Sequence, residues 1–136
     1  MKVRSAVYSL AFLFASLSPC FAHHMAVVVN KDNPVENVSA AHLAKIFHAE
    51  VKKWPDGKSV MLVLHKDSEG ETETLQRLNK MSAAEWHAFL AGHRDSIQFV
   101  ESDAEVLKMV QSEPGAIGLI DVRAIDNTIN VVHVDG

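Results

Sequence analysis

Residues 102–120 read SDAEVLKMVQSEPGAIGLI and contain a helix start, a helix stop and a buried strand, in that order. Ser102 and Glu105 have the Ser-x-x-Glu spacing of a capping box, which predicts the first turn of a helix. Pro114-Gly115 is typical of a helix end. The continuous apolar run at 116–120 predicts a strand that is buried on both faces. This stretch therefore predicts a helix and strand of an α/β fold.

The same signals occur on both sides of this stretch. Apolar runs at 26–29 and 60–64 predict buried strands, and residues 129–134 predict a last strand. Ser39 can cap one more helix, and two further Ser-x-x-Glu pairs begin at Ser68 and Ser82. Strands that alternate with helices predict parallel crossovers and a three-layer α/β sandwich that binds ligands at the carboxyl ends of its strands. Those ends are Asn30-Lys31, His65-Lys66 and Asp121-Val122.

The first 22 residues predict export. Lys2 and Arg4 precede an apolar run at 6–17, and small residues follow it up to Ala22. This is the pattern of a secretory signal peptide over residues 1–22, so we expect cleavage after Ala22 and a periplasmic protein. The apolar run is shorter than the roughly 20 residues of a spanning helix. A lipoprotein signal with acylated Cys20 is the alternative.

Composition narrows the function of the remaining domain, residues 23–136. The chain has a formal net charge of −4 at pH 7 and no run of Lys or Arg, which argues against nucleic acid and anionic membranes as partners. Its one cysteine lies in the predicted signal peptide, so a disulfide scaffold is not expected. The sequence has no Gly-x-Ser-x-Gly elbow and no Walker loop, and it predicts no enzyme and no cofactor. Asp121, at a strand end, is the best single candidate for a catalytic carboxylate, and an ordinary ion pair with Arg123 is the simpler interpretation.

Two stretches resemble a known family. Residues 28–34 (VVNKDNP), followed by Ser39, Leu43 and Trp54, resemble the part of phosphate-type periplasmic solute-binding proteins of ABC transporters where the chain crosses into the second lobe. Residues 102–120 resemble the end of that lobe. The resemblance implies one lobe of a type 2 periplasmic binding protein and a non-catalytic role in solute binding. The family normally closes two lobes on a ligand, whereas this chain matches one.

The family's phosphate-binding loop is altered in this chain. In the family, the strand that ends near Leu64 leads into a Ser-Gly-Thr-Arg-like loop that holds phosphate. Here residues 67–74 read DSEGETET, so Gly70 falls on the family glycine while Glu69, Glu71 and Thr72 replace the serine, threonine and arginine. The simpler, structural interpretation of residues 67–74 is a solvated, well-capped helix start. The alternative is a site rebuilt for a cation, an amine or a protein partner.

The resemblance and the strand ends together predict a ligand-binding set of six residues: Asn30, Lys31, His65, Ser68, Gly70 and Thr72. A phosphate-type oxyanion is the solute that the resemblance implies. It would need Lys31, His65 and Lys66 to outweigh the acidic turn, so its affinity should rise as pH falls. The competing hypothesis is a protein-interaction subunit of a membrane transport or sensor complex that binds no solute, or a homodimer whose two lobes restore a cleft.

A metal site is the weakest hypothesis. After cleavage, His23 and His24 would follow a free α-amine, and the three groups could chelate copper or nickel. The other histidines do not show the i, i+4 spacing of a zinc site.

Overall fold

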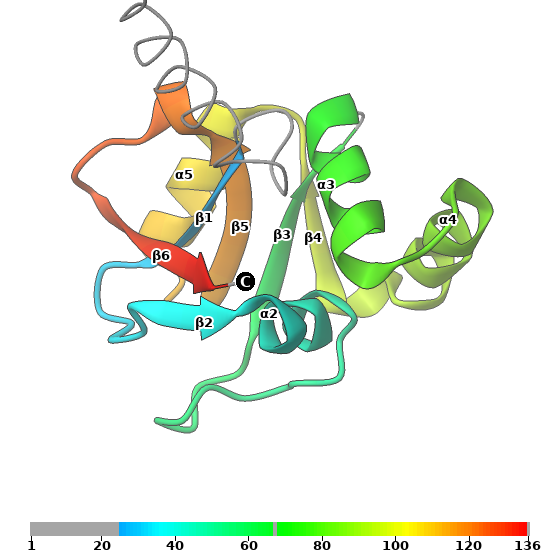
Figure 1. Cartoon of the computed structure of the whole chain (residues 1–136). Helices are drawn as coiled ribbons and strands as arrows, with labels where there is room; N and C mark the ends of the chain where they lie inside the picture. The colour runs from blue at the N-terminus through cyan, green and yellow to red at the C-terminus, as the bar shows by residue number, and fades with distance from the viewer. Residues whose placement is uncertain (1–24, 67, 136) are drawn as a thin grey trace, which may run out of the picture.

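The structure, a computed structural model, describes residues 25–66 and 68–135. Its centre is a six-stranded sheet in the order β2-β6-β1-β5-β3-β4, covered by helices on both faces (Figure 1). The strands are β1 (Met25–Asn30), β2 (Asn37–Ser39), β3 (Met61–His65), β4 (Ile97–Val100), β5 (Ala116–Asp121) and β6 (Ile129–Asp135). The helices are α2 (Ala40–Phe47), α3 (Glu69–Asn79), α4 (Ala83–Gly92) and α5 (Asp103–Ser112), with short 3-10 turns at Arg94–Ser96 and Val122–Ala124.

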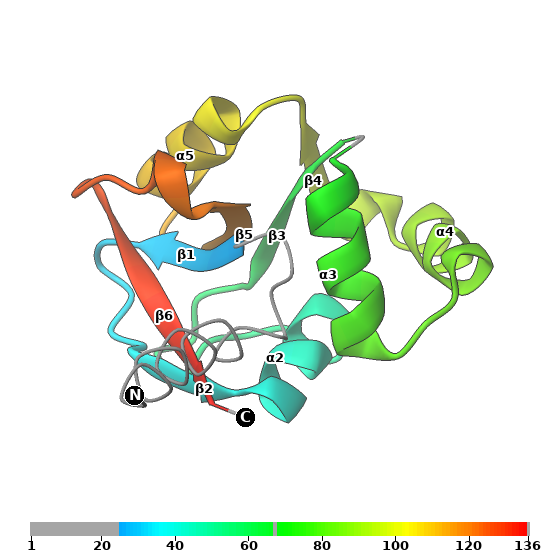
Figure 2. The same ribbon diagram turned by 45° about the horizontal axis from the view of Figure 1, so that its top comes forward.

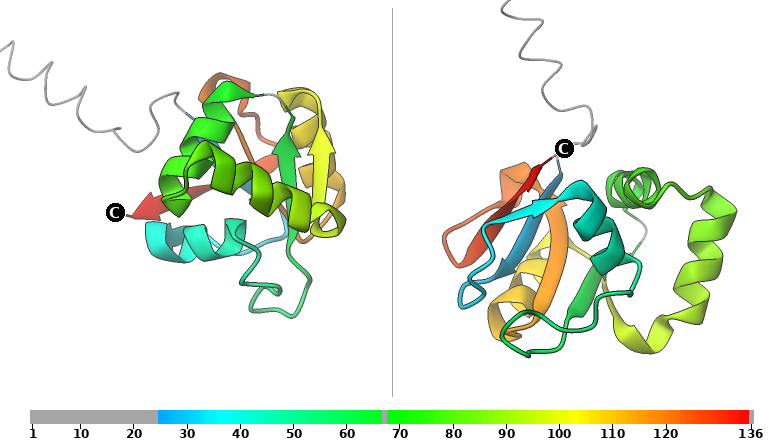
Figure 3. Two further views of the ribbon diagram at one scale, coloured as in Figure 1. Left: turned by 90° about the vertical axis from the view of Figure 1, so that its right-hand side faces the viewer. Right: turned by 60° about the horizontal axis from the view of Figure 1, so that its bottom comes forward.

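The predicted three-layer α/β sandwich is confirmed. Alternate residues of β1 face opposite layers, because successive side chains of a strand point to opposite sides of the sheet. Val27 and Val29 pack in the core formed with α2, α3 and α4, whereas Val28 packs with Val106 and Val110 of α5. Figure 2 shows the central strands between α5 on one side and α2 on the other, and Figure 3 shows α4 outside α3.

The expectation of parallel crossovers throughout is wrong for β1. Strands β3, β4 and β5 are parallel to one another, but β1 is antiparallel to both of its neighbours, β5 and β6. Met25 at the start of β1 therefore pairs with Asp121 at the end of β5. A continuous apolar run shows that a strand is buried on both faces and carries no information on its direction. The carboxyl end of β1 consequently lies at the opposite end of the sheet from those of β3 and β5.

The helix starts agree with the predicted caps, with one refinement. Four serine side chains accept hydrogen bonds from backbone amides at the helix N-caps: Ser39, Ser68, Ser82 and Ser102. Only Ser82 and Glu85 form a reciprocal capping box. Glu71 and Glu105 accept instead from amides that precede their caps, those of His65 and Glu101.

The loop between α2 and β3 is fixed against the end of α5. Trp54 Nε1 donates to the carbonyl oxygen of Gly115 at 2.9 Å, and Gly57, at φ +91°, closes the predicted turn at 54–57. A Cβ placed on Gly115 would lie 1.9 Å from the carbonyl oxygen of Ser59. The close approach of two backbones explains why glycine stands at position 115.

Within residues 25–66 and 68–135, none of the helices combines the length and the apolar character that a membrane crossing requires.

Candidate functional site

The carboxyl ends of β3 and β5 meet the first turns of α3 and α5 at one end of the sheet. β3 ends at His65 and β5 at Asp121, and the two strands are parallel neighbours. α3 begins at Glu69 and α5 at Asp103. We call this region the His65 end of the sheet. The free amides and the dipole of a helix N-terminus favour ligands that accept hydrogen bonds or carry negative charge.

Asp103 joins the two strand ends. Its Oδ1 lies 3.2 Å from Nδ1 of His65, and its Oδ2 accepts from the backbone amide of Asp121 at 3.1 Å. The His65 and Asp103 side chains are about one quarter exposed, so solvent and small ligands reach them. One carboxylate thus holds the imidazole in place and satisfies a backbone donor at the end of β5.

Arg123 is engaged by its own neighbour. Its Nε and one terminal nitrogen donate to the two carboxylate oxygens of Asp121, at 2.9 and 2.8 Å. The Arg123 side chain is 87% exposed, so this pair contributes little to stability. The interpretation of these two residues as an ordinary ion pair is confirmed.

Glu71 is the most unusual titratable group at this end. Its residue is only 2% exposed. Oε2 accepts from the backbone amide of His65 at 2.6 Å, and Oε1 has no hydrogen-bond partner among the described residues. Burial raises the pKa of the Glu71 carboxyl well above its usual value; the His65 amide lowers it and the charge of Asp103 raises it further. The expectation of a solvated acidic turn is wrong at this position.

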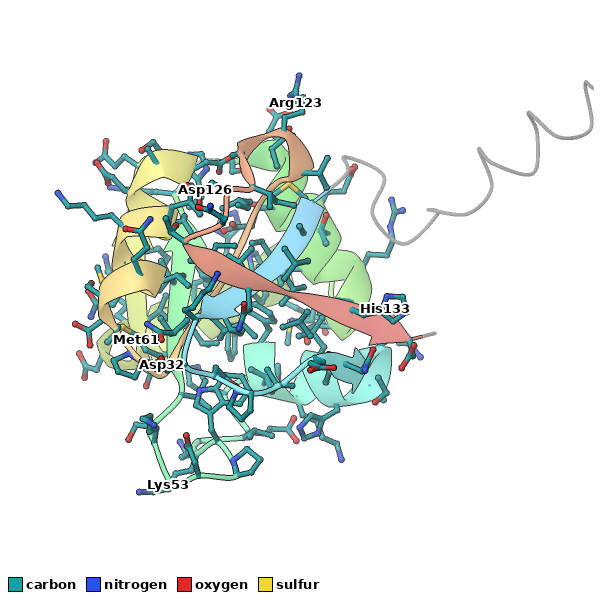
Figure 4. The ribbon with its side chains drawn as sticks, turned by 90° about the vertical axis from the view of Figure 1, so that its left-hand side faces the viewer. Asp32, Lys53, Met61, Arg123, Asp126 and His133 are labelled. Atoms are coloured by element: carbon teal, nitrogen blue, oxygen red, sulfur yellow. The ribbon has the colours of Figure 1, made fainter. Side chains whose placement is uncertain are left out.

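A pocket of about 170 Å³ adjoins Glu71. It lies between the carboxyl end of β3, the first half of α3, and side chains from α4 and β4. Larger hollows occur elsewhere, including one of about 620 Å³ at the amino end of β3, where Met61 marks its position in Figure 4. The 170 Å³ pocket is lined by both His65 and Thr72, whereas Thr72 and Ser68 also line an open hollow of about 500 Å³.

Four of the six predicted ligand residues come together at the His65 end. Ser68 is the N-cap of α3, and Gly70 and Thr72 lie in its first turn, directly after His65 at the end of β3. Thr72 lines the 170 Å³ pocket with His65. These residues are neighbours because the connection from β3 to α3 is short. Their binding of a ligand remains a prediction.

The other two predicted ligand residues lie elsewhere. Because β1 is antiparallel to β5, Asn30 and Lys31 are at the opposite end of the sheet, as Asp32 and Arg123 mark in Figure 4. Asn30 is buried, and its Nδ2 donates to the carbonyls of the last turn of α5 at 2.8 and 3.1 Å. Lys31 Nζ donates to the carbonyl of Asn127 at 2.6 Å. The expectation that they share a site with His65 is therefore wrong.

Sequence reasoning missed the burial of Glu71, although a signal for it was present. Glu71, Leu75 and Leu78 have the i, i+4, i+7 spacing of one helix face, and Leu75 is fully buried. Glu71 therefore begins the stripe that packs on the core.

The predicted signal peptide, Cys20, His23 and His24 lie outside the described residues. In the part of the chain that the structure describes, no group of three or more His, Cys, Asp and Glu side chains is arranged to hold a metal ion.

Comparisons with known proteins identify the fold. The model of a family described as PBP superfamily domain matches residues 17–135. The structure is similar to a Clostridium perfringens protein described as a phosphate ABC transporter substrate-binding protein and solved with bound phosphate (TM-score 0.68, 20% identity, covering 82% of this chain and 44% of that one). It is also similar to an ABC-type phosphate transport receptor from Vibrio cholerae (TM-score 0.67, 19% identity, covering 82% of this chain and 46% of that one). A third similar structure is PstS from Borrelia burgdorferi (TM-score 0.64, 20% identity, covering 82% of this chain and 47% of that one).

The chain spans less than half of the length of these three solved proteins. At such low identity the likeness shows the fold alone, and the partial coverage is consistent with one lobe of the type 2 architecture. The family model, by contrast, covers most of the chain. The resemblance drawn from the sequence is confirmed, and the chain belongs to the PBP superfamily.

Proposed function

We propose that this protein is an exported, non-catalytic solute-binding protein that binds a small phosphate-type oxyanion at the His65 end of the sheet. In this proposal the lobe serves a membrane transport or sensor complex. The observation that carries it is the meeting of two helix N-termini, those of α3 and α5, with the carboxyl ends of β3 and β5. Ligands of open α/β sheets bind at this position, and helix N-termini suit anions.

The first turn of α3 repels an anion less strongly than its acidic sequence indicates. The raised pKa of Glu71 keeps its carboxyl neutral to higher pH than an ordinary glutamate, because burial penalises its charge. Asp103 is paired with His65. Glu69 remains as an exposed carboxylate in the first turn, opposed by the exposed Lys66. The negative charge of the site is therefore smaller than the number of acidic residues indicates, and it depends on pH.

The donors for an oxyanion come from the first turn of α3 and from β3. The amides of Glu69 and Gly70 begin the helix, where N–H groups have no intrahelical partner. Ser68 and Thr72 add hydroxyl groups, and Lys66 adds a fixed charge. His65 adds an imidazole at the end of β3. The neutral form of the Glu71 carboxyl is favoured as pH falls, so the site loses negative charge in acid and phosphate affinity should rise.

Isothermal titration with phosphate at pH 8.0 and 5.5 tests this proposal. We expect affinity to rise toward pH 5.5. Lys66→Gln should reduce it by about tenfold or more, since a hydrogen bond to a charged group contributes about 1.5–3 kcal/mol. Lys31→Gln is the matched control, because it removes the same charge at the opposite end of the sheet.

Equal effects of the two lysine variants, or an affinity that does not change with pH, would contradict the proposed site. The absence of phosphate binding at both pH values would favour the competing hypothesis of a protein-interaction subunit.

A further inference from the structure

The 170 Å³ pocket has an apolar wall that an inorganic anion does not need. Its apolar lining comes from four elements: Leu64 of β3, Leu75 of α3, Trp86 and Leu90 of α4, and Phe99 of β4. By volume alone, a cavity of about 150 Å³ admits a molecule of the size of benzene. The pocket therefore has room for an organic molecule of a few carbon atoms.

One polar group in this pocket, the Glu71 carboxyl, lacks a hydrogen-bond partner among the described residues on one of its oxygens. Glu71 lines the pocket and is only 2% exposed, and its Oε1 has no hydrogen-bond partner among the described residues. Its other oxygen is already held by the amide of His65. Leaving a buried carboxyl oxygen unpaired is costly, so a ligand that brings an N–H donor to it would gain from the pairing.

A negative charge acts on the Glu71 carboxyl, and a cationic ligand would offset it. Asp103 of α5 acts on Glu71 with its negative charge. His65 and Lys66 at the end of β3 and His87 of α4 complete the titratable groups that line the pocket, and Lys66 and His87 are exposed to solvent. Aromatic rings attract ammonium groups, and Trp86 and Phe99 supply two of them.

We propose that this pocket binds a small organic ammonium ion, whose N–H group donates to Glu71 and whose hydrocarbon part packs against Leu75, Trp86 and Leu90. The pocket shares His65, Lys66 and Thr72 with the proposed oxyanion site, but the ammonium proposal rests on the buried Glu71 carboxyl and on the apolar wall. Binding converts a neutral Glu71 carboxyl to a carboxylate, and the proton passes to solvent. Ammonium affinity must therefore rise with pH, opposite to the trend expected for phosphate.

Titration of butylammonium chloride into the full chain, followed by calorimetry at pH 8.0 and 5.5, tests the proposal. n-Butanol serves as an uncharged probe of similar shape. We expect saturable binding of butylammonium at pH 8.0, with loss of about tenfold in affinity for each pH unit below the pKa of Glu71. n-Butanol should bind more weakly at pH 8.0, because it brings no charge to the carboxylate.

Glu71→Gln should abolish the preference for butylammonium over n-butanol. Glu69→Gln is its matched control, since it removes the same charge from an exposed position in the same helical turn. Thermal melts confirm that both variants are folded. If Glu71→Gln does not fold, Leu90→Phe narrows the pocket from a half-buried wall position and should weaken butylammonium binding.

Three results would overturn the proposal: equal affinities for butylammonium and n-butanol, no saturation at either pH, or unchanged binding by Glu71→Gln. The last result would mean that the Glu71 carboxyl does not contact the ligand. None of these results bears on phosphate, whose affinity depends on Lys66 and has the opposite pH trend, so the two proposals fail separately.

Discussion

Glu71 is a residue at which stability and binding make opposite demands. An ordinary glutamate at the third position of a helix is solvated and supports the helix dipole. Here the side chain turns inward to the amide of His65 and loses contact with water. The charged carboxylate of Glu71 would bind a cation more strongly. In the folded protein without a bound cation, burial favours the neutral carboxyl.

Replacing Glu71 with Gln is expected to stabilise the protein at neutral pH. The pKa of Glu71 is raised by folding, so its carboxyl binds a proton more tightly in the folded state. The free energy of unfolding of the natural chain must then fall as pH rises above the range of an unfolded glutamate, about 4.3, toward the folded pKa. Glu71→Gln removes this loss, and we expect a gain on the order of 1–3 kcal/mol at pH 7.

Urea denaturation of both proteins at pH 7 and pH 4 measures this difference. The gain should be larger at pH 7 and should be small at pH 4, where most of an unfolded glutamate with a pKa of about 4.3 is protonated. A difference that does not change with pH would refute the assignment to proton binding.

Gly115 is a second residue whose role is set by one contact. Gly115→Ala would place a Cβ 1.9 Å from the carbonyl oxygen of Ser59, and neither backbone can move without disturbing the hydrogen bond from Trp54. We expect a loss of about 1–3 kcal/mol or more. Gly92→Ala, at the end of α4, meets nothing within 4 Å and should leave the melting temperature nearly unchanged or slightly raised. Thermal denaturation followed by circular dichroism compares the two, and equal effects would contradict the argument.

At the scale of elements, Asn30 couples β1 to α5. Its amide nitrogen donates to two carbonyls in the last turn of α5, and its Oδ1 accepts from the amide of Asp32. Helix C-termini leave carbonyls without partners, so this side chain completes both the helix and the turn after β1.

Asn30→Ala should therefore cost stability without affecting solute binding. We expect a loss of about 1–3 kcal/mol in the free energy of unfolding, because buried carbonyls lose their donors. Phosphate affinity should not change, since Asn30 lies at the end of the sheet opposite His65. Asn127→Ala, at an exposed position, is the control for stability. A selective loss of phosphate binding in Asn30→Ala would restore Asn30 to the ligand site.

Local patterns in the sequence predicted most elements and not their directions. Serine caps and apolar runs located α2 to α5 and the strands β1, β3, β5 and β6, because capping and burial depend on neighbouring residues. The sequence did not predict β2, which is only three residues long, or β4, in which buried and exposed residues do not alternate. The antiparallel direction of β1 depends on pairing between residues about 100 positions apart, and no local pattern reports it. Asn30 and Lys31 were misplaced for that reason alone.

For the molecule as a whole, β6 matters more than its position near the end of the chain indicates. It lies between β1 and β2 in the interior of the sheet, so the last described strand pairs with the first two. From Val131 to Asp135 its residues alternate between solvent and the protein interior, with Val131 at 46% exposure and Val132 at 5%.

The neighbouring valines of β6 provide a matched pair of variants. Val132→Thr buries a hydroxyl in the core and should cost about 1–3 kcal/mol. Val131→Thr, the same change on the solvent face, should stay within about 0.5 kcal/mol of the natural protein. Chemical denaturation of the two variants measures the difference. Similar stabilities would mean that β6 does not contribute to the core through Val132.

The direction of β1 also determines which positions can be used to immobilise the protein on a sensor surface. Met25 pairs with Asp121, so β1 begins at the His65 end of the sheet, two strands away from β3. Immobilising the protein through the start of β1 would therefore screen that end from solutes. Lys53, exposed in the loop far from Arg123 in Figure 4, offers an anchor that leaves the His65 end facing the solution.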